Sequence, residues 1–76
     1  MLFADGFDEA IIGVETQFST SSVVYDQEKC IEILSRDMPL DHAIEFFYYN
    51  VLGSYVGKDT PIFLERFTKK EIIDRC

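Results

Sequence analysis

Apolar and polar residues alternate along residues 10–18, as they do in a strand that buries one face. The residues that fall on the same face are Ile12, Val14, Thr16 and Phe18. A second segment with β-branched residues, 23–25, follows a turn rich in serine and threonine at residues 19–22. Two such segments joined by a short polar turn are typical of a β-hairpin. The pattern therefore predicts a hairpin over residues 10–25.

The same segment also has the spacing of an amphipathic helix. Apolar residues recur at intervals of three or four at Phe7, Ile11, Val14 and Phe18. Gly13 lowers the helix propensity of this segment, and its β-branched neighbours prefer strands. The strand is therefore the favoured interpretation of residues 10–18, and the helix is the alternative.

Residues 26–36 have the clearest helical pattern, with Asp26 suited to cap the N-terminus. The apolar face holds Cys30, Ile31, Ile33 and Leu34, and the polar face holds Glu28, Lys29, Glu32, Ser35 and Arg36. Glu32 lies four residues before Arg36, a spacing that favours an ion pair between them. This helix is expected to pack its apolar face on the sheet.

A second helix is predicted from about Leu40 to Tyr55. Pro39 suits its first turn, and its end is expected in the glycine-containing region 53–57. The link at residues 37–39 is short, so the two helices should form an antiparallel pair.

The remaining residues predict one more strand and one more helix. Residues 62–67 follow Pro61 and have a strand-like pattern. Thr68 and Glu71 have the spacing of a capping box, which begins a short terminal helix. The order of elements indicates an α+β fold, with a small antiparallel sheet (the hairpin and the later strand) packed against the helix pair.

Length and charge limit the function. The chain has 76 residues, enough for a single domain, 1–76, and its seven phenylalanines and four tyrosines argue against disorder. Residues 1–57 hold ten carboxylates and two bases, whereas residues 58–76 hold four carboxylates and five bases. The net charge of −7 repels nucleic acid and anionic lipid, so we expect no direct binding to either. A basic protein partner is favoured.

The location of the protein is also suggested by its composition. No apolar run approaches the roughly 20 residues that a membrane-spanning helix needs. The first residues lack the basic and apolar segments of a signal peptide. We therefore expect a cytoplasmic protein.

Few residues offer chemistry. His42 and Glu45 can in principle give two ligands to a metal, but two ligands on one exposed turn are too few for most metal sites. Cys30 is a candidate nucleophile, yet its place at the centre of an apolar helical face favours a buried, protonated thiol. No nucleophile, base and orienting group can be assembled. The sequence therefore predicts a non-enzymatic protein with no catalytic residues, no cofactor and no metal.

The second helix carries more aromatic residues than one core face needs. A core-facing arc is formed by Leu40, Ile44, Phe47, Tyr48, Val51 and Tyr55. Outside this arc lies a ridge of four residues, His42, Phe46, Tyr49 and Gly53. Either another helix of the same chain covers this ridge, or the ridge binds a protein partner, since aromatic residues with a polar edge are enriched at interfaces.

Four segments of the chain together resemble a known group of proteins. They are DGFDEAIIGV (5–14), VVYDQEKCIEIL (23–34), AIEFFYYNVLGSYVG (43–57) and TPIF (60–63). In this order and spacing the chain resembles a group of small, uncharacterised proteins encoded by bacteriophages and prophages. The resemblance implies a phage accessory protein in the cytoplasm of an infected bacterium. It brings with it no activity and no functional residues, and it does not cover residues 64–76.

Three classes of function follow. The first is a protein-interaction module, acting as a homodimer or other homo-oligomer, or as an adaptor or inhibitor of a host protein, through the ridge or through the open face and edges of the sheet. The second is an acidic decoy that imitates nucleic acid and blocks a DNA-binding host enzyme. Its carboxylates would be Glu28, Glu32, Asp37, Asp41 and Glu45. An enzyme is the third and least supported class. The salt dependence of binding distinguishes the first two classes. A decoy should bind its target more weakly as the salt concentration rises, whereas binding through an aromatic interface should hardly change.

Overall fold

Strands β1 (Ile11–Gln17) and β2 (Thr20–Asp26) form the predicted antiparallel hairpin in the computed structural model, which describes residues 1–17, 20–55 and 59–75. Val14 pairs with Val23, and the register shifts between Ile11 and Gly13, where the strand bulges. The hairpin prediction is confirmed, and the helical alternative for residues 10–18 is wrong as far as Gln17, because backbone pairing with β2 determines the conformation. Of the predicted turn, residues 20–22 belong to β2, and residues 18 and 19 lie outside the described residues.

The first helix, α1 (Gln27–Leu34), begins as the sequence predicts. The side chain of Asp26 accepts hydrogen bonds from the backbone N–H groups of Glu28, at 3.1 Å, and Lys29, at 3.5 Å. These bonds satisfy N–H groups that have no partner within the helix.

Arg36 does not form the expected ion pair with Glu32. It binds Glu9 at 3.0 and 3.2 Å, while Glu32 pairs with Lys29 at 3.1 Å.

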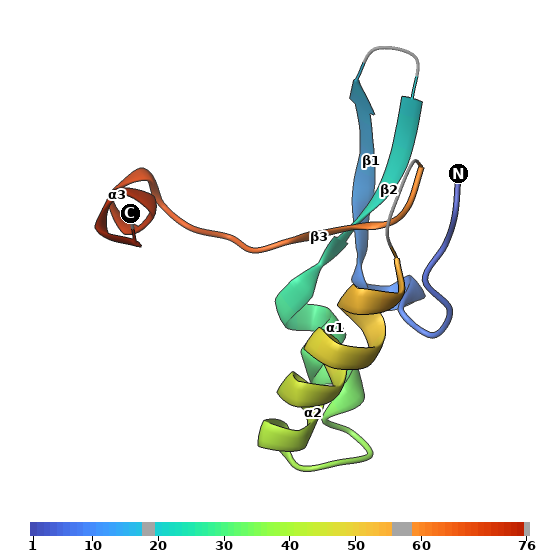
Figure 1. Cartoon of the computed structure of the whole chain (residues 1–76), viewed down its shortest axis with the longest axis vertical. Helices are drawn as coiled ribbons and strands as arrows, with labels where there is room; N and C mark the ends of the chain where they lie inside the picture. The colour runs from blue at the N-terminus through green and yellow to red at the C-terminus, as the bar shows by residue number, and fades with distance from the viewer. Residues whose placement is uncertain (18–19, 56–58, 76) are drawn as a thin grey trace.

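The second helical segment has three parts. They are α2 (Leu40–Phe46), the π-helical turn η2 (Phe47–Val51) and the 3₁₀ turn η3 (Leu52–Ser54). Together they match the predicted helix, and Figure 1 shows the chain descending through α1 and returning through α2, so the two helices are antiparallel. Residues 56–58, in the region where the helix was expected to end, lie outside the described residues.

Strand β3 (Ile62–Leu64) corrects one part of the prediction. It is shorter than residues 62–67, and it pairs with β2 in the parallel direction, through Val24 with Ile62 and Tyr25 with Phe63. The sheet is therefore mixed, in the order β1-β2-β3. The helix pair lies between β2 and β3 in the sequence, and it supplies the long crossover that parallel strands need. The α+β fold is confirmed.

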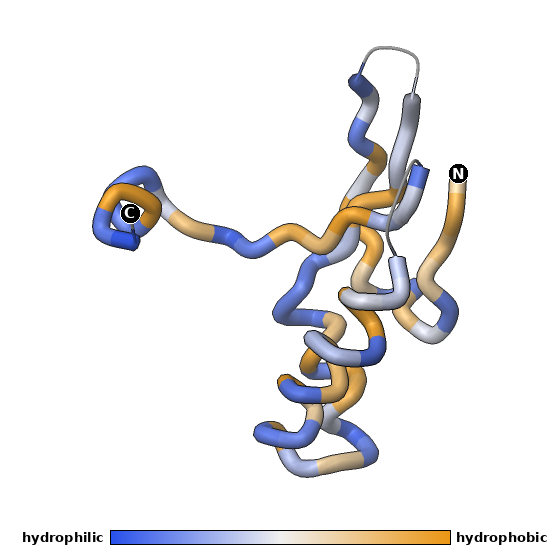
Figure 2. Tube along the Cα trace, viewed as in Figure 1, coloured by the Kyte–Doolittle hydropathy of each residue, from blue (hydrophilic) through white to orange (hydrophobic). Residues whose placement is uncertain are grey.

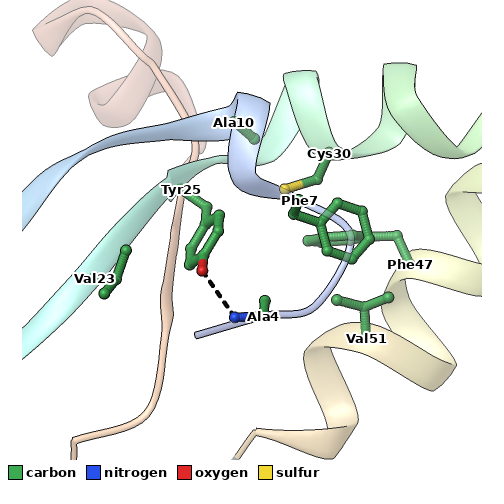
Figure 3. Packing of buried hydrophobic residues seen from close by; sticks show 8 residues of the cluster. All are labelled: Ala4, Phe7, Ala10, Val23, Tyr25, Cys30, Phe47 and Val51. Carbon is green, nitrogen blue, oxygen red and sulfur yellow. Dashed lines mark hydrogen bonds between the residues drawn. The ribbon is translucent and has the colours of Figure 1, made fainter. Parts of the chain in front are cut away.

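The core lies where the sheet meets the helices and the N-terminal segment (Figure 3). Its buried residues are Ala4, Phe7, Ala10, Val23, Tyr25, Cys30, Phe47 and Val51. Phe63 packs against this cluster, with its ring 5.2 Å from that of Phe47 and 5.5 Å from that of Tyr25. The short 3₁₀ turn η1 (Asp8–Ala10) brings Ala10 into the core beside α1.

The last helix, α3 (Lys69–Arg75), stands apart from the rest of the molecule (Figure 1). The capping box is confirmed: the backbone N–H of Thr68 donates to Glu71 Oε1 at 3.1 Å, and the N–H of Glu71 donates to Thr68 Oγ1 at 3.2 Å. Every residue from 64 to 75 is exposed. Within the described ranges, no helix has both the length and the apolar character needed to cross a membrane.

Candidate protein-binding site

The π-helical turn determines which side chains α2 presents. The backbone N–H of Leu52 donates to the carbonyl of Phe47, five residues earlier, in place of the α-helical interval of four. Side chains beyond Phe47 are therefore rotated away from the positions that a uniform α-helix gives them. Single π-helical turns of this kind occur frequently at functional sites.

A hydrogen bond from α1 holds this turn in place. Gln27 is buried at the start of α1, and its side-chain Nε2 donates to the hydroxyl oxygen of Tyr48 at 2.9 Å. A buried amide without a partner is costly, so this bond favours one placement of the turn against α1.

The aromatic residues of the predicted ridge are exposed. Phe46 is 41% exposed and Tyr49 is 81% exposed. Neither α1 nor α3 covers them, so the alternative in which a helix of the same chain buries the ridge is wrong. His42 and Gly53 are also exposed.

Two adjoining cavities, of about 320 and 280 Å³, lie beside Phe46. Met38, Phe46 and Asn50 line both, and we call the pair the α2 groove. The first cavity is lined further by Asp5, Gly6, Phe7, Ile33, Leu34, Asp37, Val51, Ser54 and Tyr55, and the second by His42, Glu45 and Tyr49. The lining of the groove thus combines apolar, aromatic and polar side chains, as the lining of binding clefts does.

The charge around the α2 groove is negative. Asp5, Asp37 and Glu45 line it, and the described lining residues include no lysine or arginine. Asp41 is exposed on the same helix, four residues before Glu45. The groove is therefore suited to a segment that has both apolar and basic side chains.

The predicted site residues separate into two groups. His42, Phe46 and Tyr49 come together in the second cavity, and Gly53 does not line the groove. A Cβ atom added at Gly53 would meet only the backbone oxygen of Tyr48, at 3.8 Å, so no close contact requires glycine there. Of the predicted acidic surface, Asp37 and Glu45 line the groove, and Glu28, Glu32 and Asp41 are exposed outside it.

The core-facing arc of the second helix was predicted only in part. Phe47 and Val51 are buried and Tyr55 is half-buried, as expected. However, Leu40 is 60% exposed and Ile44 is 38% exposed. Figure 1 shows that the start of α2 is the end of the helix pair farthest from the sheet, so no second layer covers it. Tyr48 is 44% exposed, although its hydroxyl group accepts a hydrogen bond from the buried Gln27.

Sequence reasoning missed Met38, Asn50 and the turn at residues 5–7. Asn50 had a local signal, because it lies four residues after Phe46 and eight after His42, on one side of a helix. The turn at residues 5–7 had no signal, because only the tertiary fold brings it to the end of α1.

The chemistry-bearing residues lie in different settings. Cys30 is fully buried, as predicted, and burial, with a smaller effect of the Asp26 charge, raises the pKa of its thiol to about 12. His42 and Glu45 line the same cavity. In the part of the chain that the structure describes, no three His, Cys, Asp or Glu residues gather as metal ligands would.

Comparisons with protein-family models, with curated proteins and with solved structures gave no match to this chain.

Proposed function

We propose that this protein is a non-enzymatic interaction module that binds another protein segment through the α2 groove. The observation that carries this proposal is the exposure of Phe46 and Tyr49 in a groove that is also lined by apolar side chains. Exposed aromatic side chains next to a cavity are the usual anchors of protein interfaces.

The chemistry of the groove supports a partner with apolar and basic side chains. Tyr49 exposes both a ring and a hydroxyl group, and Met38 adds a flexible apolar side chain that adapts to different partners. Asp5, Asp37 and Glu45 favour a nearby lysine or arginine on the partner.

The proposed setting is a bacterial cytoplasm during phage infection, where the protein acts as a homodimer, or as an adaptor or inhibitor of a host protein. This part of the proposal rests on the resemblance of residues 5–63 to phage-encoded proteins.

The test is the double variant Phe46→Glu with Tyr49→Lys. Both side chains are exposed, so the melting temperature should stay close to that of the wild type, with a change in stability within about 0.5 kcal/mol. Self-association by light scattering, or capture of a specific protein from bacterial lysate, should be lost. The matched control is Ile12→Glu with Val14→Lys on β1, where 44% and 55% exposed residues receive the same charges away from the groove.

Three results contradict the proposal. The wild type stays monomeric at high concentration and captures nothing, the groove variant binds as well as the wild type, or the groove variant unfolds while the β1 control does not. If binding instead falls steeply with added salt, and the groove variant binds as well as the wild type, the result supports the acidic decoy. The carboxylates of that decoy are Glu28, Glu32, Asp37, Asp41 and Glu45.

A further inference from the structure

Residues 65–75 form an arm that projects from the end of β3 and includes α3 (Figure 1). No residue of this C-terminal arm is buried. Ile72 is 51% exposed and Ile73 is 61% exposed. Figure 2 shows hydrophobic positions on α3, which stands away from the sheet and the helix pair. Two adjacent isoleucines in solvent leave a substantial apolar area without a packing surface.

Two contacts of the arm join its own residues. Arg75 lies 4.6 Å above the ring of Phe67 and 3.8 Å from the carboxylate of Glu65. The arm is joined to the body by the ion pair of Arg66 with Asp26, at 3.5 Å. A helix of seven residues is too short to be stable in water without tertiary packing, since isolated helices need roughly 12 to 15 residues. The arm therefore has the properties of a segment that packs on another surface.

Charge indicates which surface it fits. Lys69 and Lys70 are exposed on the arm and form no ion pair within the described residues, whereas Lys29, Arg36, Arg66 and Arg75 each have one. On the body, Asp41 and Glu45 are exposed carboxylates of α2 that form no ion pair in the same described ranges. The arm thus carries the two features that the α2 groove accepts, apolar side chains beside free basic groups.

We propose that α3 of one copy docks in the α2 groove of a second copy, with Ile72 and Ile73 against Phe46 and Tyr49. Lys69 and Lys70 then face Asp41 and Glu45. This inference rests on the proposed function, since it names the occupant of the same groove.

The arm of a second copy is better placed to occupy the groove than the arm of the same chain. Figure 1 shows the arm running away from α1 and α2, and Arg66 holds its base at the end of β2. Each copy offers one arm and one groove, so a reciprocal exchange between two copies forms a closed two-fold dimer and leaves neither feature unpaired.

Three full-length proteins test the exchange by sedimentation at several concentrations. They are the wild type, the groove variant Phe46→Glu with Tyr49→Lys, and the arm variant Ile72→Glu with Ile73→Glu. We expect each variant to dimerise at least about 100-fold more weakly than the wild type, because two buried apolar anchors are lost. A mixture of the two variants should recover heterodimers, since one chain keeps its groove and the other keeps its arm.

Charge reversal gives an independent measurement. Lys69→Glu with Lys70→Glu should weaken the dimer, and adding Asp41→Lys with Glu45→Lys to the same chain should restore it. The matched control is Lys29→Glu, which reverses a base of α1 outside both surfaces.

The outcomes separate this inference from the proposed function. If the groove variant loses its association or its captured protein while the arm variant dimerises normally, the groove binds something else and the arm exchange is wrong. If the arm variant alone loses association, the arm docks elsewhere and the exchange is again wrong. If neither variant changes any binding, both proposals fail.

Discussion

The backbone N–H of Ala4 donates a hydrogen bond to the hydroxyl oxygen of Tyr25, 2.8 Å away, in the interior of the protein (Figure 3). Both residues are fully buried. The bond joins the N-terminal segment to the central strand β2, and Phe7 of the same segment lies in the core cluster and also lines the α2 groove. The hydroxyl of Tyr25 therefore supports one wall of the candidate site.

The first prediction concerns this bond. Tyr25→Phe keeps the ring in the core but leaves the N–H of Ala4 without a partner, so the free energy of unfolding should fall by about 1–3 kcal/mol. Chemical denaturation measures the change. The matched control is Tyr55→Phe, because the hydroxyl of Tyr55 forms no hydrogen bond with the described residues, and it should cost much less. Equal effects of the two substitutions would contradict the role given to the bond.

The second prediction concerns Cys30. A thiol with a pKa of about 12 is protonated at neutral pH, and the thiol is buried as well, so thiol reagents should not modify it in the folded protein. A Cys76→Ser variant leaves Cys30 as the single cysteine for this measurement. Labelling should be slow in buffer and fast in denaturant. Rapid labelling of the folded variant would show that the thiol is accessible and reactive.

The same shift predicts how stability depends on alkaline pH. The folded pKa of Cys30 is above its ordinary value of 9.0, so the unfolded chain loses this proton first as pH rises. The stabilising effect is complete below about pH 9 and is lost progressively as pH rises towards 12. The difference in melting temperature between the wild type and Cys30→Ala should therefore be smaller above pH 9 than at pH 7. Parallel pH profiles would contradict this prediction.

The third prediction tests the ion pair that replaces the expected Glu32–Arg36 pair. The hydrogen bonds and charge of Arg36 hold the pKa of Glu9 below its ordinary value. In Arg36→Gln the pKa of Glu9 should rise towards that value, as measured by carboxyl chemical shifts during an acid titration. Glu32→Gln is the control and should leave the pKa of Glu9 nearly unchanged. A larger effect of the control would show that Arg36 prefers the helical partner.

The fourth prediction concerns the start of α3. Hydrogen bonds from the backbone and side chain of Thr68 lower the pKa of Glu71. A lowered folded pKa contributes stability that is present above the unfolded pKa and is lost as pH falls through the folded value. The helical Cα shifts of residues 69–75 should therefore decrease in acid. Thr68→Ala should reduce these Cα shifts at neutral pH, because loss of an N-cap destabilises a helix by about 1 kcal/mol. The neighbouring Lys69→Ala should leave the shifts nearly unchanged.

The sequence alone determined the features that depend on residues close together in the chain. Strand alternation predicted the hairpin, and Asp26 and Thr68 predicted where α1 and α3 begin, because a cap needs only the next two or three residues. The apolar face of α1 predicted that Cys30 is buried. Counting apolar positions on the second helix placed Phe46 and Tyr49 outside its core-facing arc, but only the structure showed that neither α1 nor α3 covers them.

The tertiary structure decided what depends on how distant segments meet. The long connection through α1 and α2 reverses the chain twice, so it sets the parallel direction of β3, which no local pattern in residues 62–64 contains. Arg36 pairs with Glu9, and not with Glu32 of the same helical segment, because the turn η1 packs beside α1. The first cavity of the α2 groove forms because residues 5–7 return to the end of α1, and Gly53, which follows the π-helical turn, does not line either cavity. Local propensity carries no information about contacts across such separations, so these features arise only when the whole chain packs.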